Sequence, residues 1–251
     1  MRFVHSPVAR CLAARATSAT LAAAIVVMLA GCGDSTGPAD DSYDIQFDFS
    51  TDIQGWTPGF ADYPVGAEAA YALGASLAPL PAPLDGSRKG ILLTGANHSD
   101  DLFMYVTREV ARLAPNAQYA LRFRVTLATN APKNCAGIGG APGESVVLKV
   151  GAMTAEPGRI VDASQYYRAT FDHGSQLQGG RDAMPVGNIA TSNTNCGVPR
   201  WELKEFDTGA TPITLATAAS GRVWLMVGVD SGFEGTTSVY ITSVRVAIDP
   251  R

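Results

Sequence analysis

The densest group of side chains that could do chemistry lies between two apolar segments. The stretch 97–101 reads Asn-His-Ser-Asp-Asp. Hard cations such as Ca²⁺ take carboxylate and carbonyl oxygens, so Asp100 and Asp101 are candidate calcium ligands, and with Asn97 they are candidate ligand-binding residues. The spacing is not that of an EF-hand loop. The alternative is a tight turn, because Asn, Ser and Asp side chains bond their own backbone in chain reversals.

Two histidines follow residue 31, namely His98 and His173, and Asp172 precedes the second of them. A zinc site or an acid–base pair would require the two imidazoles to meet in the fold, which sequence spacing does not establish. Solvated loop histidines are the alternative. If the domain has a binding site here, we expect Asp172 and His173 to converge with the 97–101 stretch on one concave face.

Three acidic residues, Glu202, Glu205 and Asp207, are the candidate catalytic carboxylates. Glycoside hydrolysis uses paired carboxylates, and Glu205 and Asp207 would share one face of a strand. Charged solvent-facing positions explain the same pattern. No nucleophile elbow or phosphate-binding loop is complete elsewhere, since the Gly-Glu-Ser of 143–145 lacks the final glycine. The sequence therefore favours a non-catalytic domain, with a polysaccharide hydrolase as the alternative.

Aromatic side chains are the other feature that could bind a ligand, because flat rings bury area against the apolar faces of sugars. Tyr63 and Tyr71 stand in or beside a Gly- and Pro-containing region, and we expect them, with one tyrosine of the pair 166–167, to be surface contacts. Trp56 and Trp224 are expected to lie in the core.

The elements that position these residues follow an N-terminal leader. Residues 1–31 contain three of the 19 basic residues and none of the 23 acidic ones, so the remainder carries 16 basic against 23 acidic groups, a net charge of −7. This acidic balance disfavours a nucleic-acid partner. The apolar run 21–30 is about half the roughly 20 residues of a membrane-spanning helix, which indicates a cleaved export signal.

The leader ends in Leu29-Ala30-Gly31-Cys32, which resembles the lipobox of bacterial lipoproteins. That resemblance implies cleavage before Cys32 and a lipid on its thiol, which would hold the protein at a membrane. An ordinary secretory signal with a chance cysteine is the alternative. We expect a signal peptide over 1–31, a lipidated N-terminus and flexible tether over 32–42, and a folded domain over 43–251. Because Gly33 follows the cysteine, the outer membrane is the expected destination.

Two cysteines remain in the expected domain, Cys135 and Cys196. Export places them in a compartment that permits disulfides, so we expect them to pair. A metal site is the alternative, but it would need further soft ligands nearby.

Apolar residues alternate with polar ones from residue 43 onward, for example over 43–49, 118–127, 223–229 and 240–248. This period of two predicts half-buried strands, and further candidates at 90–94, 102–110, 145–150, 166–171 and 201–206 bring the number to roughly ten. No segment after the leader shows a convincing helical stripe, and turn residues separate the strands. The sequence predicts a single antiparallel, all-β sandwich domain.

The strand edges resemble those of jelly-roll carbohydrate-binding modules. The similarity rests on Phe-Asp-Phe at 47–49 with Gly-Trp at 55–56, on the segment 113–119 leading into a strand, and on the last strand, 239–246. It implies a jelly-roll-like fold and a glycan ligand. Many such modules carry aspartate after the Tyr-Ile pair of the last strand, where this chain has Thr242 and Ser243. Segments 60–64, 99–105 and 137–145 are also similar to uncharacterised exported bacterial lipoproteins, which implies no activity.

These observations predict a membrane-anchored lipoprotein whose non-catalytic β-sandwich binds a glycan or another envelope or extracellular ligand. A structural envelope component without a small ligand is a further alternative. Calcium is the one cofactor for which the sequence offers candidate ligands, and the membrane, through Cys32, is the expected partner.

Overall fold

The computed structural model describes residues 2–3 and 42–251. Cys32 and nearly all of the predicted leader and tether lie outside these residues. The described part of the chain is built of strands, turns and loops, and none of it lies in a helix able to cross a membrane.

Eight strands form the larger sheet, and the long strand β16 runs through its middle. The first half of β16 pairs with β6 and the second half with β2, while β8 runs along the other edge and pairs in turn with β13 and β14. The strands of this sheet are β1 (Arg2–Phe3), β2 (Tyr43–Asp48), β5 (Gly74–Pro79), β6 (Lys89–Ala96), β8 (Gln118–Thr129), β13 (Glu202–Asp207), β14 (Ile213–Ala216) and β16 (Thr236–Pro250).

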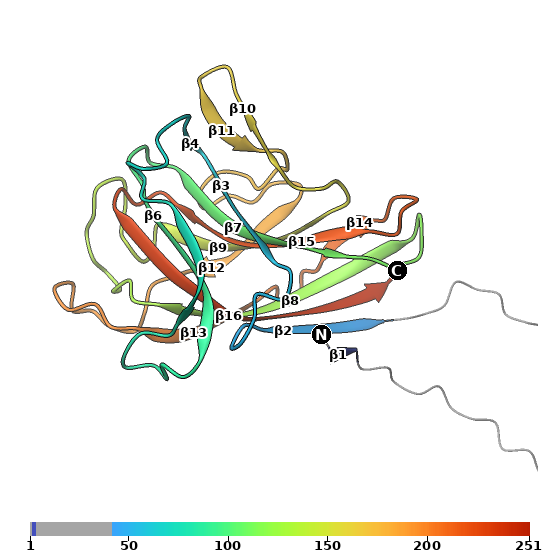
Figure 1. Ribbon diagram of the computed structural model, residues 1–251, viewed down its shortest axis with the longest axis horizontal. Helices are drawn as coiled ribbons and strands as arrows, with labels where there is room; N and C mark the ends of the chain where they lie inside the picture. The colour runs from blue at the N-terminus through green and yellow to red at the C-terminus, as the bar shows by residue number, and fades with distance from the viewer. Residues whose placement is uncertain (1, 4–41) are drawn as a thin grey trace, which may run out of the picture.

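The smaller sheet has five strands in the order β12-β9-β15-β7-β3, and a separate three-stranded sheet has the order β10-β11-β4. The five strands are β3 (Thr57–Ala61), β7 (Leu102–Val110), β9 (Val146–Met153), β12 (Ala183–Asn188) and β15 (Val223–Ser231). The three-stranded sheet consists of β4 (Tyr63–Pro64), β10 (Arg159–Val161) and β11 (Tyr166–Ala169). All strand pairs are antiparallel, and the two larger sheets lie face to face (Figure 1). The predicted antiparallel β-sandwich is confirmed.

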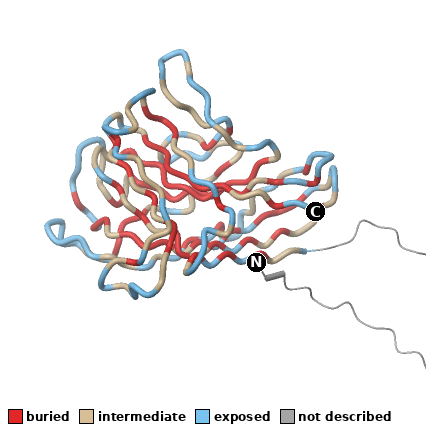
Figure 2. Tube along the Cα trace, viewed as in Figure 1, coloured by how far each residue is buried: buried red, intermediate tan, exposed pale blue. Residues whose placement is uncertain are grey.

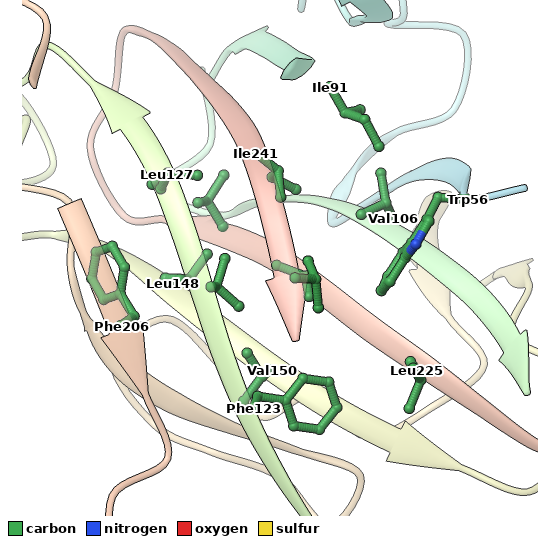
Figure 3. Close-up of a cluster of buried hydrophobic side chains, with 14 of the residues drawn as sticks. Trp56, Ile91, Val106, Phe123, Leu127, Leu148, Val150, Phe206, Leu225 and Ile241 are labelled. Atoms are coloured by element: carbon green, nitrogen blue, oxygen red, sulfur yellow. The ribbon is translucent and has the colours of Figure 1, made fainter. Parts of the chain in front are cut away.

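One continuous apolar core fills the space between the two sheets (Figure 2). It forms because alternating side chains of a strand point to opposite faces, so the apolar set of β8 faces inward while Arg122 and Arg124 face out. Trp56 is 1% exposed and lies among the buried apolar side chains of this core (Figure 3). It meets Phe47 and Phe49 edge-on, with ring centroids 5.3 and 6.0 Å apart. Its predicted core position is confirmed.

The three central strands of the smaller sheet, β7, β9 and β15, are buried on both faces, in contrast to the half-buried strands that the sequence predicts. All eight residues of β9 are buried, because a second apolar cluster covers the outer face of this sheet. In that cluster Phe171, from the segment after β11, packs edge-on against Tyr105 with ring centroids 5.2 Å apart. The segment between β9 and β12 therefore acts as a third layer.

The predicted disulfide between Cys135 and Cys196 is confirmed, with Cα atoms 5.7 Å apart and a sequence separation of 61. It joins the loop between β8 and β9 to the loop between β12 and β13. The bond thus fixes the chain five residues before Trp201.

Candidate functional site

A buried ion pair lies on the outer face of the smaller sheet. Lys149 on β9 and Asp230 on β15 have fully buried side chains, and the Lys149 Nζ lies 2.7 Å from Asp230 Oδ2. The same ammonium donates to the backbone oxygen of His173 at 2.8 Å. Because an isolated buried charge is costly, each of these groups compensates the charge of the other in the interior.

The imidazole of His173 connects this pair to a second carboxylate. Its Nε2 lies 3.1 Å from Asp62 Oδ2 and its Nδ1 lies 3.5 Å from Asp230 Oδ2. The ring stacks on Phe103 with centroids 4.0 Å apart. Burial disfavours the charged ring, but the interactions with Asp230 and Asp62 outweigh it and raise the pKa of His173 to about 9.

Asp101 and Arg168 complete the cluster near the surface. Arg168 Nη1 lies 2.8 Å from Asp62 Oδ1 and 3.9 Å from Asp101 Oδ2, and its Nε donates to Asp162 at 2.9 Å. Burial and the nearby charges of Asp230 and Asp62 raise the pKa of Asp101 to about 7. Burial also acts to raise the pKa of Asp62, but His173 and Arg168 outweigh it and hold that pKa below its usual value.

We call these six residues the ionic cluster: Asp62, Asp101, Lys149, Arg168, His173 and Asp230. Three carboxylates face three cationic groups, so the charges compensate one another. Among the residues that the structure describes, no three side chains of His, Cys, Asp or Glu are arranged to hold a metal ion. The arrangement suits a structural ionic network that fastens the covering segment, through His173, to the sheet.

The structure brings together two of the predicted site residues, Asp101 and His173. Asn97 is buried, and its Nδ2 donates to the backbone oxygens of Ser231 and Phe233 at 2.8 and 3.1 Å. The Asn97 Oδ1 accepts from Ser99 N at 3.0 Å, so the turn interpretation describes its contacts.

Asp100 and Asp172 are exposed turn residues. Asp100 has a φ of +59°, and its backbone oxygen accepts from Gln176 Nε2 at 2.6 Å. The carboxylate of Asp172 accepts from the backbone N–H groups of Gly174 and Arg181 at 3.1 and 2.9 Å. Both positions therefore shape the loops around the ionic cluster.

The prediction that Tyr63 and Tyr71 lie at the surface is wrong. Their exposed fractions are 0% and 3%, and their ring centroids are 5.8 Å apart. The reason is that β4 pairs with β11, which sets the Tyr167 ring 5.1 Å from that of Tyr63. The Tyr63 hydroxyl accepts a hydrogen bond from Arg159.

The candidate catalytic carboxylates lie on two faces of β13. Glu205 and Asp207 are exposed on the outer face, as the strand alternation predicts. Glu202 points to the other face, where it accepts from the backbone N–H and the hydroxyl of Ser192 at 2.8 and 2.9 Å. Asp207 accepts from Gly209 N at 2.7 Å and so ends the strand in a turn.

A second candidate site lies on the outer face of the larger sheet, which sequence reasoning missed. Tyr240 of β16 lies on this face and pairs with Ala128 of β8, which pairs on its other side with Leu203 of β13. The Trp201 ring meets that of Tyr240 edge-on, with centroids 5.1 Å apart at 82°. Both rings are partly exposed, and Leu203 is 45% exposed.

Polar groups surround this aromatic pair. Thr94 and Ser238 hydroxyls lie 2.7 Å apart on one side, and Ser243 and Thr126 hydroxyls lie 3.1 Å apart on the other. A hollow of about 240 Å³ opens beside them. Its lining includes Asn130, Pro132, Pro142, Cys196, Pro199, Phe233, Thr236 and Ser238. We call the exposed outer surface of β6, β8, β13 and β16, with Trp201, the open face.

The signals that could have found these sites are weak. Lys149 interrupts an otherwise apolar strand, and Asp230 ends another, which is the pattern of a buried ion pair. Trp201 stands at the edge of a predicted strand, but its contact with Tyr240 depends on the pairing of β13 and β16 with β8.

No protein-family model and no curated protein sequence matches the chain. Among solved structures it is similar to the enzymatically active domain of bacteriophage CBA120 tailspike protein 4, at 11% identity and a TM-score of 0.31, covering 78% of this chain and 20% of that one. It is also similar to the CBM22-1–GH10 modules of a Clostridium thermocellum xylanase complexed with xylohexaose, at 10% identity and a TM-score of 0.36, covering 82% and 28%. A third is the mannan-recognising carbohydrate-binding module TmCBM27, at 11% identity and a TM-score of 0.35, covering 83% and 98%. The chain thus spans less than a third of the first two structures, and the fold rests on its own strand pairing.

Proposed function

We propose that this domain binds a glycan on its open face, with Trp201 and Tyr240 as the residues that contact the sugar rings. The observation that carries the proposal is the partly exposed aromatic pair on the solvent side of a sheet. Exposed aromatic rings offer a large apolar area at a small cost in conformational entropy. The C–H-rich face of a pyranose is a suitable partner for such a ring.

The polar groups around the pair support the same ligand class. Hydroxyls of Thr94, Ser238, Thr126 and Ser243 can each donate and accept, as a sugar hydroxyl can. The Asn130 amide lines the neighbouring hollow. A few convergent polar groups beside an apolar surface are typical of binding sites for small polar ligands.

We expect this binding to be non-catalytic. Glycoside hydrolysis needs two carboxyl groups on either side of the scissile bond. Glu202 lies on the other side of β13 and is held by Ser192. Glu205 and Asp207 share the open face, but they lie side by side on one strand and Asp207 caps the turn at Gly209. These positions favour a binding surface over a hydrolase.

The proposal includes a membrane anchor. The Leu-Ala-Gly-Cys motif ending at Cys32 supports lipidation of that thiol after removal of 1–31, with outer-membrane attachment through a tether over 32–42. Lipid chains contribute about 0.8 kcal/mol per buried methylene, which is enough for two or three chains to hold a folded domain at a membrane. The domain would then retain glycan close to the cell envelope.

Affinity electrophoresis through gels containing single polysaccharides tests glycan binding. We expect retardation of the purified chain in at least one gel of a broad panel, and loss of that retardation in Trp201→Ala. Tyr166→Ala, which removes a partly exposed ring on β11, is the matched control and should migrate as the parent chain does. Unretarded migration of the parent chain in every gel would exclude the proposal.

A further inference from the structure

A second hollow lies on the open face, at a break in the edge of the larger sheet. Strand β8 pairs with β13 from Arg124 onward and with β14 up to Leu121, so Arg122 and Phe123 have no strand partner on that side. The connecting loop 208–212 turns away at Gly209, whose φ is +56°. The break leaves a hollow of about 350 Å³.

Three arginines line this hollow, and two of them are held in place from outside. Arg122 Nη1 lies 2.8 Å from Asp249 Oδ2, and Arg245 binds Asp44 through two nitrogen atoms. Asp44 and Asp249 do not line the hollow. A guanidinium has five N–H donors in a planar fork, so these ion pairs orient Arg122 and Arg245 while leaving donors free for a ligand.

The third arginine, Arg124, is exposed on β8, where it lies between Asp207 of β13 and Arg245 of β16. In the described part of the chain, no acidic side chain forms an ion pair with it. Asp207 is its cross-strand neighbour, but that carboxylate accepts the Gly209 N–H at 2.7 Å and caps the turn. Asp207 is also the one acidic residue among those that line the hollow. The wall of the hollow is therefore rich in unused cationic donors.

This local surface contrasts with the rest of the domain, where acidic residues exceed basic ones. Charge interactions between exposed groups are screened within about 10 Å at 0.1 M salt. An anion would therefore be attracted by the hollow itself rather than by the net charge of the protein. A carboxylate suits the site, because Arg binds planar carboxylates through two parallel hydrogen bonds.

We propose that the hollow binds the carboxylate of an acidic polysaccharide, a polyuronate, whose sugar rings contact Trp201 and Tyr240. This inference rests on the proposed glycan binding and names its substrate class. Tyr240 pairs with Ala128, four residues along β8 from Arg124, so the two parts of the site are separated by roughly 14 Å at about 3.4 Å per residue. One extended glycan chain lying along β8 can reach both.

The test compares polygalacturonate with its fully methyl-esterified form by titration calorimetry, using the full chain. We expect the free acid to bind at least about tenfold more tightly, because a charge-assisted hydrogen bond is stronger than a neutral one. Arg124→Gln should lose about tenfold or more for the free acid and little for the ester. Arg112→Gln, which changes an exposed arginine outside the open face, is the matched control and should bind as the parent chain does.

The outcomes separate this inference from the proposed function. If Trp201→Ala abolishes glycan binding while Arg124→Gln leaves it unchanged, the polyuronate inference is wrong and glycan binding stands. If no glycan binds, both are wrong. If Arg124→Gln weakens binding only to inorganic phosphate or to phosphatidylglycerol vesicles, the hollow is a phosphate or lipid site, which also overturns the inference.

Discussion

Loss of the Lys149 ammonium should strongly destabilise the domain. In Lys149→Met the Asp230 carboxylate would lose its cationic partner at 2.7 Å and keep the weaker contact with His173 Nδ1 at 3.5 Å. Both side chains of the pair are fully buried, so water cannot replace the lost interaction. Breaking one partner of a buried ion pair costs about 3–5 kcal/mol. For a domain of this size, 1 kcal/mol corresponds to about 2–4 °C, so Tm should fall by roughly 6–20 °C.

Urea unfolding followed by tryptophan fluorescence measures this cost, because Trp56 lies in the core. The double variant Lys149→Met/Asp230→Asn removes the orphaned charge and should recover part of the loss, with a coupling energy above about 1 kcal/mol. Lys89→Met, at a partly exposed position on β6, should change stability by less than about 0.5 kcal/mol. A loss below about 1 kcal/mol in Lys149→Met, or full additivity in the double variant, would refute the role given to the buried pair.

Three further predictions concern the disulfide, pH and the anchor. Replacing Cys135 by Ser should cost about 4 kcal/mol in unfolding experiments on the chain-entropy model, because the bond closes a loop across 61 positions; an unchanged unfolding midpoint would contradict this. Between pH 5 and 9 stability should decrease, because the raised pKa of His173, about 9, gives a stabilisation that is complete below pH 6.5 and lost as the pH rises through 9. The raised pKa of Asp101, about 7, also makes stability decrease as the pH rises toward 7. Asp101→Asn should therefore flatten the plot of urea midpoint against pH below pH 7. An unaltered plot would contradict this role of Asp101. Cells fed radiolabelled palmitate should label the chain, and Cys32→Ser should abolish the label; a variant that is still labelled would exclude lipidation at this thiol.

Much of the fold could be predicted because strand alternation is a local property of the sequence. The predicted strand over 102–110 coincides with β7, and the confirmed disulfide is expected because two cysteines remain after the predicted export signal. The third layer could not be predicted in this way. The residues that cover the smaller sheet, such as Phe171, carry no periodic signal that says which surface they will contact.

The candidate sites depend on pairing between distant segments, which explains why they were found only in part. Asp101 and His173 stand in conspicuous polar stretches, whereas their partners Lys149 and Asp230 are single charges within apolar strands. Tyr63 stands in a Gly- and Pro-containing segment that is typical of a surface loop, but it is buried because β11 pairs with β4. Polarity is visible in the sequence, but the face on which a side chain lies also depends on which strands become neighbours.

The most direct test of glycan binding is a titration that uses the variants of the aromatic pair. The chain should bind at least one polysaccharide of a broad panel saturably, and Trp201→Ala and Tyr240→Ala should each weaken that binding by about tenfold or more, since stacked aromatic anchors dominate such contacts. Circular dichroism spectra of the variants should match that of the parent chain, because both rings are partly exposed. Undiminished binding by both folded variants, or absence of binding across the panel, would contradict the assignment of the open face as a glycan site.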